Sequence, residues 1–238
     1  MSVTALLVFA RCAGFAFRAP GFAHPSVTPA LRAGLAAFLA IATAPSAGSA
    51  LGPIEGLAVV PAFALEFLIG SAIGMTASLV YDGAYAGGRA VDDYVGVKAI
   101  APSLQLVAPS GFGRMWSLAY TGGFFLSGAY RVTILAFAHG FARLAPGSAV
   151  DAHAWSAYAG ALAAGIASVG VAVAAPAIGS AFVAQTALGA LSRAVPRFGS
   201  FTLAFPLAFA AALVATVLGV PSIVPSDLLP VSAIPGVP

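Results

Sequence analysis

A single carboxylate inside a long apolar run constrains this chain more than any other feature. Residues 65–96 read LEFLIGSAIGMTASLVYDGAYAGGRAVDDYVG, and Glu66 is the only charged residue before Asp82. On an α-helix, Glu66, Gly70 and Gly74 fall four residues apart on one face, where glycine lets a neighbouring backbone approach most closely. The pattern therefore predicts a helix-packing seam that carries a carboxylate.

The far end of the same stretch is charged. Arg89, Asp92 and Asp93 fall within one helical turn, directly after a cluster of glycines. The glycine cluster and the charged tip together predict a break in the helix and a hairpin. Because adjacent aspartates point to different helix faces, a solvated tip is favoured over an intramembrane aspartyl or ion-binding site.

The composition places the chain in a membrane or a membrane-bound assembly. Hydrophobic residues make up 61% of the 238 residues and charged residues 7%, with a mean hydropathy of +1.01. In soluble proteins about a quarter of residues are charged. The net charge of +3 is spread over single basic residues, which argues against a nucleic-acid-binding stripe. The single cysteine, Cys12, excludes an internal disulfide and is interpreted as a small buried apolar residue.

Hydropathy and helix-breaking residues divide the chain into about six broken apolar segments, each near the roughly twenty residues that a membrane helix needs. The predicted segments cover residues 3–19, 27–43, 65–96, 115–138, 152–192 and 198–220, with a loop over 44–56. Residues 152–192 fit either two helices or one helix kinked at Pro176. We expect one membrane domain over residues 1–220 and, from its closely spaced prolines, an extended tail over 221–238.

Charged side chains inside these segments need protein or water around them. A charge at the centre of a bilayer costs about 3 kcal/mol even on lenient scales, so we expect Arg11, Glu66 and Arg131 to face other helices or water. For Glu66 two interpretations stay open: pairing with an arginine or hydroxyl of the same bundle, and a role in gating or subunit contact. For Gly70 and Gly74, packing within the chain and packing between subunits both stay open.

The sequence contains no recognisable catalytic constellation. It has no H-E-x-x-H, G-x-S-x-G, Walker or G-x-G-x-x-G motif, and its three histidines lie far apart. We therefore expect no enzymatic activity, no metal and no cofactor. The phenylalanines considered for a gate are interpreted as core or interface residues instead; they are Phe15, Phe17, Phe22, Phe124 and Phe125. Charges in broken helices also occur in small-solute transporters and channels, which remain the alternative function.

Four blocks of sequence resemble one family. FARCAGFAFRAPGFAHPSVTPALRAGLAAFLAIATAP matches the family's opening pattern through Arg11, Gly14, Pro20, Pro29 and Arg32. EFLIGSAIG with AGGRAVDDYVG resembles its glycine-rich helix and following segment through Glu66, Gly70, Gly74, Gly87, Asp92 and Gly96. YTGGFFLSGAYRV is loosely similar to the third block. APAIGSAFVAQTALGALSRAVPRFGSFTLAFPL resembles the carboxyl-terminal signature through Pro176, Leu188, Gly189, Arg193, Pro196, Phe201 and Pro206. The family is FliR/SctT, the membrane subunit of the flagellar and injectisome type III export gate.

The resemblance implies an all-α polytopic membrane protein of the bacterial inner membrane, with broken helices arranged as bent hairpins. It implies a structural subunit of a passage for unfolded secreted polypeptides, assembled with FliP-, FliQ- and FlhB-like partners. The residues expected to serve assembly or gating are Arg11, Glu66, Gly70, Gly74, Asp92, Gly189, Arg193 and Pro196.

Overall fold

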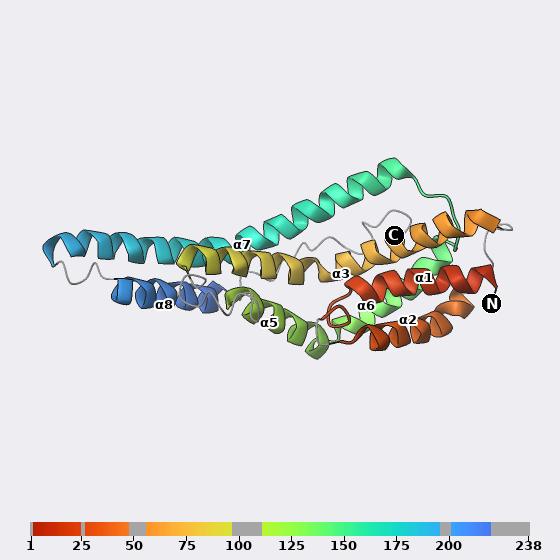
Figure 1. The fold of residues 1–238 in the computed structure, drawn as a ribbon, viewed down its shortest axis with the longest axis horizontal. Coiled ribbons are helices and arrows are strands. Elements are labelled where there is room, and N and C mark those ends of the chain that lie inside the picture. Colours follow the sequence, from red (N-terminus) through yellow and green to blue (C-terminus); the bar gives the residue numbers. More distant parts are fainter. Residues whose placement is uncertain (1, 25–26, 48–55, 97–110, 196–200, 220–238) are drawn as a thin grey trace. The chain divides into compact units, whose positions relative to one another are not determined.

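The structure is a computed structural model that describes residues 2–24, 27–47, 56–96, 111–195 and 201–219. Most of these residues form helices. Figure 1 shows α1 (Val3–Arg18), α2 (Pro29–Thr43), α3 (Val59–Val95), α5 (Phe112–Leu126), α6 (Ala129–Arg143), α7 (Ala152–Ala194) and α8 (Phe201–Gly219), with short 3-10 turns at Ala44–Ser46 and Gly56–Ala58. The described residues contain no strand, so the predicted all-α class is confirmed. The predicted tail over 221–238 lies outside the described residues.

Local capping explains why α1 and α2 begin where the sequence predicted. The Ser2 hydroxyl accepts the N–H of Ala5, and the Thr28 hydroxyl accepts the N–H of Leu31, so each helix start has a donor satisfied. Pro29 occupies the first turn of α2, where its missing N–H costs nothing.

The helix α3 differs from its predicted form. It continues to Val95 without the expected break at the glycine cluster, and Gly96 ends it with a φ of 85°. The glycines instead give neighbouring backbones room. A Cβ at Gly87 would collide with the carbonyl oxygen of Gly170, and one at Gly88 would lie 2.5 Å from the amide nitrogen of Gly113. The glycines that predicted a turn therefore serve close packing between helices instead.

The predicted segment over residues 115–138 is two helices. They bend by 74° at a break formed by Ser127 and Gly128, where Gly128 has a φ of 76°. By contrast, α7 is one helix that contains Pro176, so the two-helix alternative for residues 152–192 is wrong. The last helix, α8, likewise contains Pro206.

The number of helices long enough to cross a membrane is smaller than the number of apolar segments. Among the described residues, Gly56–Val95 and Ala152–Ala194 are long and apolar enough, and the bent pair α5 and α6 adds a third if it forms one span. The helices α1 and α2 have 16 and 15 residues, which is short of the roughly twenty that a span needs. The chain is thus a membrane protein in which the helices too short to span a bilayer need protein or water around their ends.

The helices pack into two compact units. One contains α1, α2 and α6 with α3 up to Leu79 and α7 up to Ala164, and α1 lies beside α2 within it (Figure 1). Its buried core includes Leu7, Phe15, Ala36, Leu39, Ile69, Phe137 and Phe141. The other contains α8 with the later parts of α3 and α7 and the start of α5. Its core includes the cluster of Val91, Val95, Phe112, Ala174, Ala177, Ala181, Ala208 and Ala212.

The core of the first unit provides a test of the fold. Phe137 is 1% exposed and stacks on Phe15 with ring centroids 4.4 Å apart, whereas Phe38 is 68% exposed. We expect Phe137→Ala to lower the free energy of unfolding by about 3–5 kcal/mol through the cavity it leaves. Phe38→Ala is the matched control and should leave the thermal unfolding temperature in detergent nearly unchanged. Equal shifts for the two variants would contradict the assigned packing.

Candidate functional site

The site is built on a close crossing of α1 and α3. A Cβ added at Gly70 would collide with the carbonyl oxygen of Arg11, and one at Gly74 would lie 2.8 Å from the carbonyl oxygen of Phe15. On the opposite side of the crossing, Gly14 meets the backbone of α3 in the same way. The glycine seam predicted from the sequence is therefore occupied by a helix of the same chain, which favours packing within the chain over packing between subunits.

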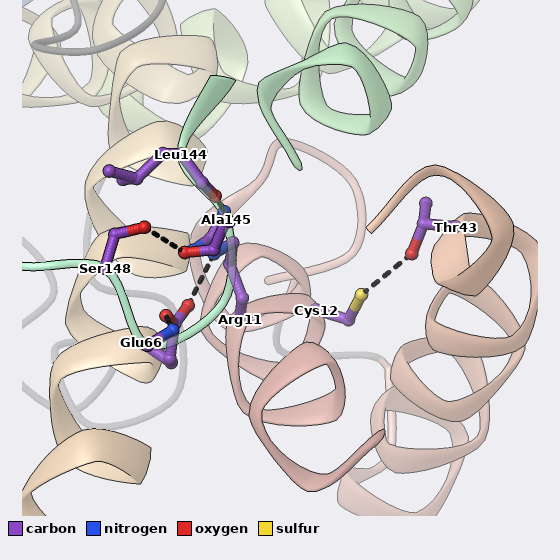
Figure 2. A network of polar contacts seen from close by, with 8 residues as sticks. Arg11, Cys12, Thr43, Glu66, Leu144, Ala145 and Ser148 are labelled. Carbon is purple, nitrogen blue, oxygen red and sulfur yellow. Dashed lines mark hydrogen bonds and ion pairs between the residues drawn. The ribbon is translucent and has the colours of Figure 1, made fainter. Parts of the chain in front are cut away.

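A buried ion pair lies at this crossing (Figure 2). The Nε of Arg11 donates to Oε2 of Glu66 over 2.5 Å, and both side chains are 1% exposed. The pairing answers the question that the sequence left open, because the carboxylate is satisfied by an arginine of the same bundle. The close backbone approach at Gly70 brings the Arg11 backbone, and hence its guanidinium, within reach of α3.

Both members of the pair also hold the turn that follows α6. Nη1 of Arg11 donates to the carbonyl oxygen of Leu144 over 2.6 Å, and the N–H of Gly147 donates to Oε1 of Glu66 over 2.8 Å. The turn itself closes through the N–H of Ser148, which donates to the carbonyl oxygen of Ala145 over 3.1 Å. Gly147 has a φ of 81°, which fits the third position of a type II turn with Pro146 in the second position. Residues 144–148 are thus fixed to α1 and α3 by charge-assisted bonds.

The chemistry of this site is structural. Both oxygens of the Glu66 carboxylate accept hydrogen bonds, and the Arg11 guanidinium also lies over the Phe141 ring with its Cζ 4.6 Å from the centroid. Burying two charges carries a large desolvation cost, which the attraction between them offsets only with good geometry and further hydrogen bonds. The arrangement can hold three segments in register, and among the described residues it leaves one buried nitrogen, Nη2 of Arg11, without a hydrogen-bond partner.

Two further polar contacts support α1 and α2. The Sγ of Cys12 lies 3.7 Å from Oγ1 of Thr43, whose hydroxyl donates to the carbonyl oxygen of Leu39 over 2.8 Å (Figure 2). Nη2 of Arg32 donates to the carbonyl oxygens of Ala23 and His24 over 3.1 and 2.8 Å. Cys12 is fully buried, as its interpretation as a small apolar residue predicted.

Asp92 is not part of a solvated tip, and that prediction was wrong for this residue. Its side chain is 1% exposed and accepts the N–H groups of Phe112 and Gly113 over 3.0 and 3.3 Å, whereas Asp93 is exposed. These N–H groups open α5 and have no partner within that helix, and a helix N-terminus favours a negative charge. Asp92 caps a helix that begins twenty residues later, which a local sequence pattern does not reveal.

The remaining predicted residues do not join the ion pair. Arg11, Glu66, Gly70 and Gly74 lie together in the first compact unit, while Gly189 and Arg193 are exposed near the end of α7 in the other unit. A Cβ at Gly189 would meet open space. Pro196 lies outside the described residues.

The phenylalanines considered for a gate pack mainly against each other inside the first unit. Phe15 is buried against Phe137, and Phe22 lies between Phe15 and Phe125, with its ring centroid 6.5 Å from each. Phe17 and Phe125 are nevertheless exposed, at 52% and 41%. The interpretation as core or interface residues fits this arrangement.

Sequence reasoning missed the turn over residues 144–148 and the contact of Tyr158 with α3. The Tyr158 hydroxyl bonds to the hydroxyl of Thr76 and donates to the carbonyl oxygen of Ala72. The Pro146 and Gly147 pair signals a turn, but its partner Glu66 is 81 positions away. Only the fold brings them together.

The glycine seam yields a matched test. We expect Gly70→Ala to lower the thermal unfolding temperature and the yield of folded protein, because the added methyl group collides with the Arg11 backbone. Gly160→Ala is the control, since a Cβ there meets open space on an exposed helix face. Alanine in an open helix position should be neutral or stabilising by up to about 1 kcal/mol. Loss of stability in both variants alike would argue against the close crossing.

The ion pair yields a second test. Glu66→Leu leaves the Arg11 charge buried without its partner and should cost about 3–5 kcal/mol of stability. The double variant Arg11→Met with Glu66→Leu removes both charges and should recover most of that loss. Thermal unfolding of the single and double variants in detergent measures the coupling. Strictly additive effects would show that the two side chains do not pair.

A family model described as bacterial export proteins, family 1, matches residues 2–226, which is nearly the whole chain. A comparison with curated proteins gave no match. The buried Arg11 and Glu66 and the glycines between them all lie inside the matched region. The chain is a structural component of a bacterial export apparatus, and it belongs to the FliR/SctT family of bacterial export proteins.

Proposed function

We propose that this membrane protein is a structural subunit of the type III protein export gate, where it helps to form the passage for unfolded secreted polypeptides. The family match over residues 2–226 carries the proposal. The passage would belong to a flagellar or injectisome apparatus in the bacterial inner membrane, and the subunit would act without catalysis. Residues 1–220 would form the membrane domain, followed by the tail over 221–238.

The exposed surface supports assembly with other membrane subunits. The helix α2 is too short to span a bilayer, yet it exposes Leu31, Phe38 and Ile41 to between 55% and 75%. A short helix with an exposed apolar side is stable in a membrane when neighbouring subunits cover its ends and its polar backbone groups. FliP-, FliQ- and FlhB-like subunits are the proposed neighbours.

The second unit offers an apolar groove between α7 and α8. Its volume is about 700 Å³, and its lining residues are Ser180, Ala184, Leu188, Leu207, Ala210, Ala211, Val214, Ala215 and Leu218. The Ser180 hydroxyl, the polar group of this lining, already donates to the carbonyl oxygens of Ala177 and Ala211. Small residues along such a groove let a second helix approach closely. A helix of a neighbouring export-gate subunit fits this surface.

The predicted site residues divide between two proposed roles. Arg11, Glu66, Gly70 and Gly74 would fix the fold of the first unit so that it presents a stable surface for assembly. Asp92 would do the same for the start of α5. Gly189, Arg193 and Pro196 would serve contacts at the end of α7. Energy for transport would come from other components, since the sequence contains no nucleotide-binding motif.

Co-purification tests the proposed function. We expect a tagged chain, expressed with its native partner genes and extracted in mild detergent, to recover FliP- and FliQ-like subunits in one complex. Deletion of the gene should abolish secretion while export substrates still accumulate in the cytoplasm. Recovery of the chain alone, together with normal secretion after deletion, would overturn the proposal.

A reconstitution experiment separates the alternative function. The purified chain alone in liposomes should give no substrate-dependent flux of small solutes, because the passage needs the other subunits. Saturable flux by the chain alone would favour a transporter or channel.

A further inference from the structure

The outward face of α6 carries a charge that its own compact unit does not neutralise. Arg131 is exposed on the chain, and among the described residues its polar partner is the hydroxyl of Tyr130, which accepts from Nε over 3.0 Å. Arg11 in the same unit is instead buried and paired with Glu66. Of these two arginines in apolar helices, Arg11 is therefore neutralised by a carboxylate of its own unit, whereas Arg131 is exposed.

Both carboxylates in the described part of the first unit are already engaged. Its described acidic residues are Glu66 and Asp151. Glu66 is bonded to Arg11 and Gly147, and Asp151 accepts the N–H of His153 at the start of α7. Within its described residues, the first unit therefore offers Arg131 no counter-charge.

Arg131 also lies inside an apolar stretch. The nearest other charged residues along the chain are Arg114 and Arg143. The bent helix pair α5 and α6 is long and apolar enough to form one broken membrane span or a re-entrant loop. In either topology Arg131 lies away from the ends of the apolar stretch, where lipid headgroups would be. An uncompensated arginine at such a depth is costly, so it normally faces protein or water.

The guanidinium of Arg131 contacts the side chain of the neighbouring Tyr130. Its Cζ lies 5.7 Å from the centroid of the Tyr130 ring, and that ring packs against Phe125 with centroids 5.6 Å apart. Because Nε is engaged by Tyr130, both terminal nitrogens remain to donate in the parallel fork that matches a carboxylate. Val132 and Leu135, exposed to 67% and 58%, provide apolar contact on the same side of the helix.

From these observations we propose that the face of α6 formed by Arg131, Val132 and Leu135 is a subunit interface, on which an apolar membrane helix of another export subunit places an aspartate or glutamate against Arg131. The proposal rests on the proposed function, because it assigns a contact within that assembly. A partner helix of this kind would supply both a carboxylate for Arg131 and an apolar surface for Val132 and Leu135.

Substitution at Arg131 tests the charge. Arg131→Met should lower the amount of co-purified partner subunit about tenfold or more, since removing one member of a buried charge pair strongly weakens an interface. Arg131→Lys should restore part of it, because it supplies the charge without the fork. Arg143→Met, on the last turn of the same helix and also exposed, is the matched control and should bind as the unchanged protein does. Because Arg131 is exposed, all three variants should keep the same thermal unfolding temperature.

Photo-crosslinking identifies the occupant. With p-benzoylphenylalanine replacing Leu135, irradiation of the assembled complex should join α6 to a membrane-segment peptide of a partner that contains Asp or Glu. The same group replacing the buried Phe137 should react within the chain. Adducts of the Leu135 probe with lipid alone, or with a second copy of this chain, would overturn the proposal, as would full partner recovery by Arg131→Met. If the unchanged chain recovers no partner at all, the proposed function fails instead.

Discussion

The packing of the first unit depends on the ion pair between Arg11 and Glu66. Each charge is buried in an apolar bundle, so each is tolerable only because the other lies 2.5 Å away and because Leu144 and Gly147 add further hydrogen bonds. The pair joins α1 to α3 and both to the turn after α6. Any other register of the helices would separate the two side chains and leave a buried charge without its partner. The pair therefore makes the bundle strongly prefer one register.

The same principle organises the rest of the described chain. Asp92, another carboxylate inside an apolar helix, is likewise bonded by groups of the same chain, the first N–H groups of α5. The surfaces left over are apolar, including the groove between α7 and α8. Such surfaces suit assembly with other membrane helices, and Arg131 adds a charge that can select the partner on one of them. This combination fits a structural subunit of an export apparatus.

Much of the fold could be predicted from the sequence because it follows local rules. The apolar runs and the helix-breaking residues between them predicted most helices, and the spacing of Glu66, Gly70 and Gly74 predicted the seam. The predicted break near Gly87 was wrong because glycine marks both turns and close helix contacts. The environment of Asp92 could not be predicted, since the helix it caps starts after an intervening segment of the chain.

By itself the sequence determined that the chain is helical, belongs in a membrane and carries a carboxylate on a glycine face, because composition and helical spacing are local properties. The tertiary structure alone decided what meets that face. Arg11 is 55 positions from Glu66 and Gly147 is 81 positions away, and spacing along one helix carries no information about which distant segment packs against it. The close approach of backbones at Gly70 settles that choice, because it lets α1 come near enough for the two charges to pair.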